Sequence, residues 1–248
     1  MYATGVYRSA TQINSAMGRV YGHMALAVIT SMIVSYLVGS NATLMEFFFT
    51  GAMKWLVIFA PLVAILGVSF AMDKLSKSTL QMFLHGFAAL MGLSFATIFV
   101  VYNMGSIVSA FMGAAVLFAT MSGYGYFTKR NLDSVGQFMF IGLIAIIIAS
   151  IVNIFIGSTV FQMVISAIGI IVFLGLTAYD TQKIREMVSY DNDGKAEVAG
   201  ALSLYLDFIN LFLMLLQLFV GRKDKTDCLV SSGVEQRLYT AKVRGSKP

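Results

Sequence analysis

Seven long apolar runs follow one another along the chain, and they constrain the fold more than any other feature. Each contains about 20 residues, the length that an α-helix needs to cross the hydrocarbon core of a bilayer. Only 12% of the 248 residues are charged, whereas soluble domains have about 25%. We therefore expect an all-α integral membrane protein with seven transmembrane helices, at residues 20–38, 55–72, 79–102, 106–127, 136–156, 160–180 and 199–220.

The same runs define the domain organisation. We expect a cytoplasmic N-terminal segment at residues 1–19, a transmembrane domain at residues 20–222 and a polar tail at residues 223–248. The tail is aperiodic, so we expect either a disordered extension or a chance extension of the reading frame past its natural end. Pro61 lies inside the second run, where it should kink the helix or leave a backbone group that needs another partner.

Lysine and arginine concentrate on one side of the predicted membrane. With the N-terminus inside, the outer loops carry only Lys54, and the inner segments carry Arg8, Arg19, Lys74, Lys77, Lys129, Arg130, Lys183, Arg185 and Lys195. Short cytoplasmic loops are enriched in these residues, so we expect a cytoplasmic N-terminus. The tail cations, including Arg222, would lie outside if the last run spans the membrane, which we favour over a re-entrant segment. Loop charges also explain the net charge of +5, which gives no reason to expect nucleic-acid binding.

Two aspartates lie within the last two apolar runs, where ionisable residues are costly and are functional candidates. Asp180 ends the sixth run and Asp207 lies in the inner half of the seventh. Small or polar residues recur on the helix face of Asp207, which predicts that this face meets protein or a wet cavity: Gly200, Ser203, Asn210, Met214 and Gln217. Taken singly, Asp207 could be a helix–helix clasp, and Asp180 a solvated helix end paired with Lys183 or Arg185.

Considered together, the positions of the two aspartates predict that their carboxylates lie close to each other. Their runs are joined by a short connection, residues 181–198, so both side chains can enter one cavity near the cytoplasmic side. Two carboxylates in a poorly hydrated place cannot both ionise at low cost, so they take up a proton as a unit. They also supply part of a ligand set for Ca²⁺, with Asn210 and Thr177 as candidate neighbours. We expect a transient Ca²⁺ site and no bound cofactor.

His85 is a weaker candidate within the third run. It shares a helix face with the small residues Ala89, Gly92 and Ala96, and such faces favour close helix packing. We therefore favour a packed, hydrogen-bonded histidine over a proton relay.

Three classes of function could use two intramembrane aspartates: an ion pathway, an intramembrane aspartyl protease, and a membrane interaction protein. The protease class has a GxGD motif around its second aspartate, but Tyr205 and Leu206 precede Asp207 here. It also has a Pro-Ala-Leu motif, and no proline lies between Pro61 and Pro248. We therefore do not expect an enzyme.

Three segments resemble the characteristic motifs of the Bax inhibitor-1 family, also called the transmembrane Bax inhibitor motif family. They are GLTAYDTQKIR at 175–185, ALSLYLDFINLFLMLL at 201–216 and SGYGYFTKRNL at 122–132, and the last is similar to the bacterial YccA-like branch. The resemblance covers about residues 15–222. It implies six helices around a central seventh, and a pH-sensitive Ca²⁺ leak controlled by a di-aspartyl unit that aligns with Asp180 and Asp207.

The same resemblance implies a latch, an alternative function and a location. Some family members carry an arginine on the second helix that latches to the sixth-helix aspartate. This chain has no arginine in its second run, and Lys74 could replace it only in part because lysine lacks the bidentate fork. The YccA-like branch resembles modulators of a membrane-anchored AAA protease, so the alternative partner is a membrane protease or another membrane protein. The implied location is the lipid bilayer of a bacterial inner membrane.

Overall fold

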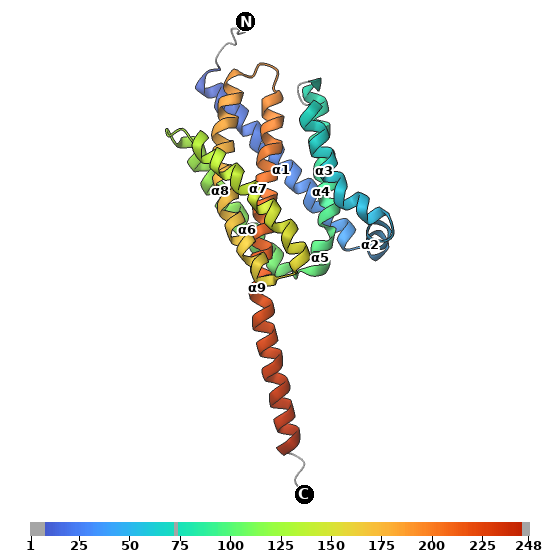
Figure 1. Cartoon of the computed structure of the whole chain (residues 1–248). Coiled ribbons are helices and arrows are strands. Elements are labelled where there is room, and N and C mark those ends of the chain that lie inside the picture. The colour runs from blue at the N-terminus through green and yellow to red at the C-terminus, as the bar shows by residue number, and fades with distance from the viewer. Residues whose placement is uncertain (1–7, 72–73, 245–248) are drawn as a thin grey trace.

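The computed structural model describes residues 8–71 and 74–244, and within these ranges every regular element is helical. The membrane-length helices stand side by side as a bundle, from which the end of the last helix projects (Figure 1). An all-α fold is therefore confirmed. In chain order the elements are α1 (Ala10–Gly39), α2 (Ala42–Phe49), α3 (Met53–Ala71), α4 (Lys77–Ser94), the short 3₁₀ helix η2 (Phe95–Thr97), α5 (Ile98–Val101), α6 (Met104–Phe127), α7 (Asp133–Ile156), α8 (Thr159–Tyr190) and α9 (Lys195–Arg244).

Within the part of the chain that the structure describes, six helical segments are long and apolar enough to cross a membrane. They are α1, residues 77–101 (α4 to α5), α6, α7, α8 and residues 195–219 of α9. The second predicted run is part of a broken element, because α2 and α3 are bent by 76° relative to each other. Gly51 lies at this break with a φ of 58°, a conformation that glycine adopts readily. A seventh crossing exists only if the bent pair is one span, so the count of seven stays a prediction.

Pro61 lies inside α3, and the helix continues through it. Because proline has no amide hydrogen, the carbonyl of Val57 four residues earlier loses its usual helical donor. The hydroxyl of Ser94 on α4 donates to this carbonyl at 2.8 Å. The prediction that Pro61 leaves a backbone group in need of another partner is therefore confirmed.

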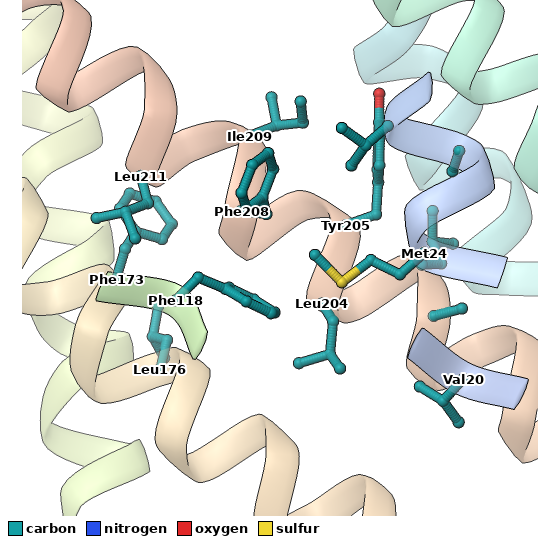
Figure 2. Packing of buried hydrophobic residues seen from close by; sticks show 14 of the residues in the cluster. Val20, Met24, Phe118, Phe173, Leu176, Leu204, Tyr205, Phe208, Ile209 and Leu211 are labelled. Carbon is teal, nitrogen blue, oxygen red and sulfur yellow. The ribbon is translucent and has the colours of Figure 1, made fainter. Parts of the chain in front are cut away.

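The last helix is the centre of the bundle. In its most apolar stretch 67% of the residues are buried, against 11–33% in the other five spans. α9 packs against α1, α4, α6 and α8, while α3 packs on α4 and α7 on α8. Its apolar face meets α1, α6 and α8 in the core (Figure 2), where the labelled residues are Leu204, Tyr205, Phe208, Ile209 and Leu211 of α9, Val20 and Met24 of α1, Phe118 of α6, and Phe173 and Leu176 of α8. The prediction of a central last helix is confirmed.

Small residues bring α1, α4 and α9 close together. A Cβ atom added to Gly92 of α4 would lie 2.5 Å from the carbonyl oxygen of Ser31 on α1, so a larger residue would push these helices apart. The Ser31 hydroxyl lies 2.8 Å from the carbonyl oxygen of Ala88 and 2.6 Å from the hydroxyl of Tyr205 on α9. This contact confirms the close packing expected for the helix face that includes His85.

α8 and α9 are both longer than predicted, and only residues 191–194 connect them. Residues 181–190 stay helical because Ile184 and Val188, four residues apart, are buried in the core. The carboxylate of Asp191 then accepts hydrogen bonds from the amides of Gly194 and Ala196, each at 3.1 Å. Asp180 therefore lies well inside α8, and the prediction that it ends a helix is wrong.

The chain ends also differ from the predicted boundaries. α1 begins at Ala10, where Ser9 and Gln12 form a capping box, and Ile13 and Met17 are buried. The backbone of α9 continues as a helix to Arg244, although a disordered tail was expected, and residues 223–244 contain no proline to stop it. The start of α1 and the end of α9 lie at opposite ends of the molecule (Figure 1), as expected if the last run spans. Residues 1–7 and 245–248 lie outside the described residues.

Candidate functional site

A cavity of about 870 Å³ lies among α3, α7, α8 and α9, and both predicted aspartates line it. Apolar side chains of α3 and α7, such as Leu62 and Phe140, form much of its lining. The polar residues that line it are Gln137, Ser150, Tyr179, Asp180, Ser203, Asp207 and Asn210. The cavity thus combines an apolar surround with two carboxylates and several neutral oxygen atoms.

Asp207 is the most unusual residue of this cavity. It lies 12 residues beyond the first residue of α9, which is about 18 Å along the helix axis. Its side chain is only 6% exposed. Its Oδ2 is the one buried side-chain oxygen or nitrogen without a hydrogen-bond partner in the described part of the chain. Leaving such an atom unpaired costs about 1–3 kcal/mol or more, and it is typical of a site that binds a proton, an ion or water.

Asp180 of α8 enters the same cavity, so the two carboxylates come together as the sequence predicted. Its carboxylate accepts a hydrogen bond from the hydroxyl of Ser203 on α9, one turn before Asp207. Asp180 and Asp207 therefore line one cavity from two adjacent helices. The carboxylate pair therefore spans the contact between the central helix and α8.

Lys183 and Arg185, the two cations that could have paired with Asp180, form contacts with other residues. Lys183 pairs with Glu186 at 3.0 Å. Arg185 donates to the carbonyl oxygen of Tyr126 at 3.0 Å and lies over the ring of that tyrosine. The alternative of a solvated helix end paired with Lys183 or Arg185 is therefore wrong.

The small and polar stripe of α9, which was predicted to meet protein or a wet cavity, faces α8 and the cavity. Beyond the Ser203 to Asp180 hydrogen bond, a Cβ added to Gly200 would lie 2.6 Å from Ile184 of α8. A Cβ added to Gly169 of α8 would in turn lie 2.9 Å from the sulfur of Met214 on α9. The stripe therefore allows close approach on both sides of the cavity.

A neutral amide network adjoins the cavity toward the end of the bundle opposite the N-terminus. Asn153 of α7 donates to Gln162 of α8 at 2.9 Å, and Gln162 donates to Gln217 of α9 at 2.6 Å. The hydroxyl of Ser166 also donates to Gln217, at 3.1 Å. These bonds join three helices one turn beyond Met214, which itself lines the cavity.

Of the weaker candidate residues, only Asn210 lines the cavity of the aspartate pair. Asn210 lines the cavity, and its amide donates to the carbonyl of Leu206 on its own helix at 2.8 Å. Thr177 is fully buried, and its hydroxyl donates to the carbonyl of Phe173 at 2.7 Å. Thr177 is not among the residues that line the cavity.

Lys74 and His85 also lie outside the cavity. Lys74 is exposed, and no hydrogen bond or ion pair joins it to Asp180 among the described residues, so the lysine latch is not formed. His85 is half-buried on α4.

Glu197 is a prominent acidic residue that the sequence analysis did not single out. It lies in the first turn of α9 and is 1% exposed. Its carboxylate pairs with Arg19 at 2.6 Å, Lys77 at 3.2 Å and Arg8 at 3.4 Å. The signal in the sequence was an acidic residue at the start of an apolar run, on the same predicted side as these cations. Glu197 ties the start of the central helix to α1 and α4.

The described residues contain no cluster of three or more histidine, cysteine, aspartate or glutamate side chains that could hold a metal ion. The cavity instead offers two carboxylates together with the neutral oxygen atoms of Ser203 and Asn210. Ca²⁺ takes six to eight oxygen ligands, so such a set could bind it only loosely.

Comparison with known proteins agrees with this architecture. The model of the family described as inhibitor of apoptosis-promoting Bax1 matches residues 13–225. The inner membrane protein YbhL of Escherichia coli strain K12 is 40% identical over 218 residues, covering 85% of this chain and 93% of that protein. An uncharacterized membrane protein of Streptococcus pyogenes serotype M3 is 36% identical over 224 residues, covering 88% and 96%. The family match includes both aspartates and Ser203.

Proposed function

The chain belongs to the Bax inhibitor-1 family of membrane proteins, and we propose that it forms a pH-sensitive Ca²⁺ leak in a bacterial inner membrane. The observation that carries this proposal is the buried, unpartnered Oδ2 of Asp207 in a cavity that it shares with Asp180. A carboxylate placed in this way needs a proton or a cation to compensate its charge.

Proton binding and Ca²⁺ binding exclude each other at such a pair. When both carboxylates are ionised, they repel one another across a poorly hydrated cavity, and a divalent cation relieves that repulsion. When the pair takes up a proton, it loses charge and binds the cation less well. The pH of the solution thereby sets how often Ca²⁺ occupies the cavity.

The residues around the carboxylate pair favour the passage of Ca²⁺ over its tight binding. Ser203 and Asn210 add neutral oxygen atoms near the pair, which favours weak binding and rapid release. An ion that leaves toward the end of the bundle opposite the N-terminus meets the amide network of Asn153, Gln162 and Gln217. This network is the candidate barrier, because its amides must separate before the ion can pass.

The orientation that we propose has the N-terminus in the cytoplasm. At the N-terminal end of the bundle, Lys74, Lys129 and Arg130 lie in connections and Lys195 begins α9, while Lys54 lies in the first turn of α3, which begins at the other end (Figure 1). Loops rich in lysine and arginine stay on the cytoplasmic side. Asp180 then lies toward the cytoplasmic end of α8, and Asp207 lies near the middle of the span at residues 195–219.

Proteoliposomes that contain a trapped Ca²⁺ indicator provide the direct test. Purified, folded protein should admit external Ca²⁺ faster than empty liposomes do, and the rate should change between pH 6 and pH 8. An absence of leak above empty liposomes, with the helix content of the reconstituted protein verified by circular dichroism, would contradict the proposal.

The alternative is a membrane interaction protein that modulates a membrane-anchored AAA protease. Affinity purification of the tagged protein from membranes separates the two functions. A stoichiometric protease partner, combined with an absence of Ca²⁺ flux, would favour the alternative.

A further inference from the structure

A second cavity, of about 470 Å³, lies at the N-terminal end of the bundle. It is formed mainly by the connection between α6 and α7 and by the last turns of α8. Four cations and two carboxylates line it, so positive charge is in excess: Lys129, Arg130, Lys183 and Arg185 against Asp133 and Glu186.

The two adjacent cations of the connection supply the uncompensated charge. Lys183 is paired with Glu186, and Arg185 lies on Tyr126. Among the described residues, neither Lys129 nor Arg130 forms an ion pair with a carboxylate. These two side chains are therefore available to an anion in the cavity.

The connection that carries them is held in place by Gln182 of α8. The Gln182 side chain donates to the carbonyl oxygen of Arg130 and accepts from the amide of Leu132, each at 2.9 Å. Leu132 is also buried, at 5% exposure. The cations are thus presented on a fixed backbone, which reduces the entropy lost when a ligand binds.

The cavity lies where a helix of membrane length ends. α6 ends at Phe127, two residues before Lys129. Phe127 is 78% exposed and Tyr190, which lines the cavity, is 58% exposed. An exposed tyrosine at the end of a membrane helix is typical of the lipid headgroup level, where its ring and its hydroxyl meet different surroundings.

We propose that this cavity binds a phosphate-bearing anion, supplied by a lipid headgroup or by a soluble phosphate. Arginine binds phosphate oxygens in a bidentate manner and lysine adds a point charge. Basic pockets between membrane helices on the cytoplasmic side bind anionic headgroups in this way. Binding here does not depend on the Ca²⁺ leak, although Tyr179 lines both this cavity and the cavity of the carboxylate pair.

Native mass spectrometry of the full chain in detergent tests the lipid source. The native protein should retain phosphatidylglycerol in preference to phosphatidylcholine. The double variant Lys129→Gln with Arg130→Gln should bind phosphatidylglycerol about thirtyfold more weakly, since each of the two cations near the surface contributes about one kcal/mol. The matched control Lys54→Gln, which removes a cation from the opposite end, should bind as the native protein does. Gln182→Leu keeps the charges but releases the connection, and it should also weaken binding.

A second arm tests the soluble source with inorganic phosphate and glycerol 3-phosphate, measured by calorimetry on the same proteins. If either compound binds with dependence on Lys129 and Arg130 and phosphatidylglycerol does not, the ligand is a soluble phosphate. If the double variant binds both kinds of ligand as tightly as the native protein, the site is wrong. The site is also wrong if the native protein neither prefers phosphatidylglycerol to phosphatidylcholine nor binds a soluble phosphate.

Discussion

The hydroxyl of Ser203 on the central helix donates a hydrogen bond to the carboxylate of Asp180 on α8. Asp207 lies one turn further along the same face of α9, and it has no equivalent donor for its Oδ2. The two aspartates of the cavity therefore differ: one is held by a serine across the helix contact, and the other retains an unpaired oxygen atom. This asymmetry leads to separate predictions for the two residues.

Ser203→Ala should shift the pH response of the Ca²⁺ leak. The serine hydroxyl favours the ionised form of Asp180, so without it the carboxylate takes up a proton at a higher pH. The midpoint of the response should therefore move to a higher pH, measured as Ca²⁺ entry into proteoliposomes. Ser150→Ala is the matched control, because Ser150 lines the same cavity from α7. An equal shift in both variants would show that the Ser203 hydrogen bond is not the cause.

Asp207→Leu should make the protein more stable while it abolishes the leak. The substitution removes an unsatisfied buried oxygen atom, so the free energy of unfolding should rise by about 1–2 kcal/mol. Thermal unfolding of the purified protein in detergent measures the change. A lower melting temperature would show that other groups of the protein stabilise the Asp207 carboxylate. That result would contradict the proposal that this carboxylate is held for a proton or a cation.

Glu197→Gln should destabilise the fold. Glu197 is buried and its charge compensates Arg8, Arg19 and Lys77, which would repel one another without it. Because these cations are partly solvated, the expected loss is about 2 kcal/mol of unfolding free energy, and high salt should reduce it. Glu186→Gln is the control: its pair with Lys183 is exposed, so its loss should stay below about 0.5 kcal/mol. Equal effects would show that the Glu197 pairs do not stabilise the start of α9.

Ser94 and Pro61 should be energetically coupled. Ser94→Ala leaves the Val57 carbonyl without its donor, and should cost about 1–2 kcal/mol of unfolding free energy. In a Pro61→Ala background, the new amide of residue 61 can donate to Val57, so the same Ser94→Ala change should cost less. A double-mutant cycle measures the difference. Strictly additive effects would show that the serine does not replace the hydrogen bond that proline removes.

The periodicity of the sequence predicted which face of α9 is small and polar. Small and polar residues at helical spacing indicated a face that meets protein or a wet cavity, and in the structure this face lies against α8 and the cavity. The sequence also paired Asp180 with Asp207 correctly, because consecutive antiparallel helices must be neighbours when their connection is short.

Other features depend on contacts between distant segments, which spacing along one helix does not record. The partners of Glu197 come from three separate parts of the chain, and Gln182 holds a connection about 50 residues earlier. Helix ends were also misjudged where charged residues continue a helix, as in residues 181–190, because buried Ile184 and Val188 outweigh their polar neighbours.

The measurement that tests the central claim most directly compares the pH response of Ca²⁺ entry in native protein, Asp180→Asn and Asp207→Asn. Asp133→Asn is the control, because Asp133 is exposed and lies outside the cavity of the pair. We expect a leak that changes between pH 6 and pH 8 in the native protein and in Asp133→Asn, and a leak that no longer responds to pH in either cavity variant. An unchanged pH response in both cavity variants, with folded protein verified by circular dichroism, would contradict the role of the aspartate pair.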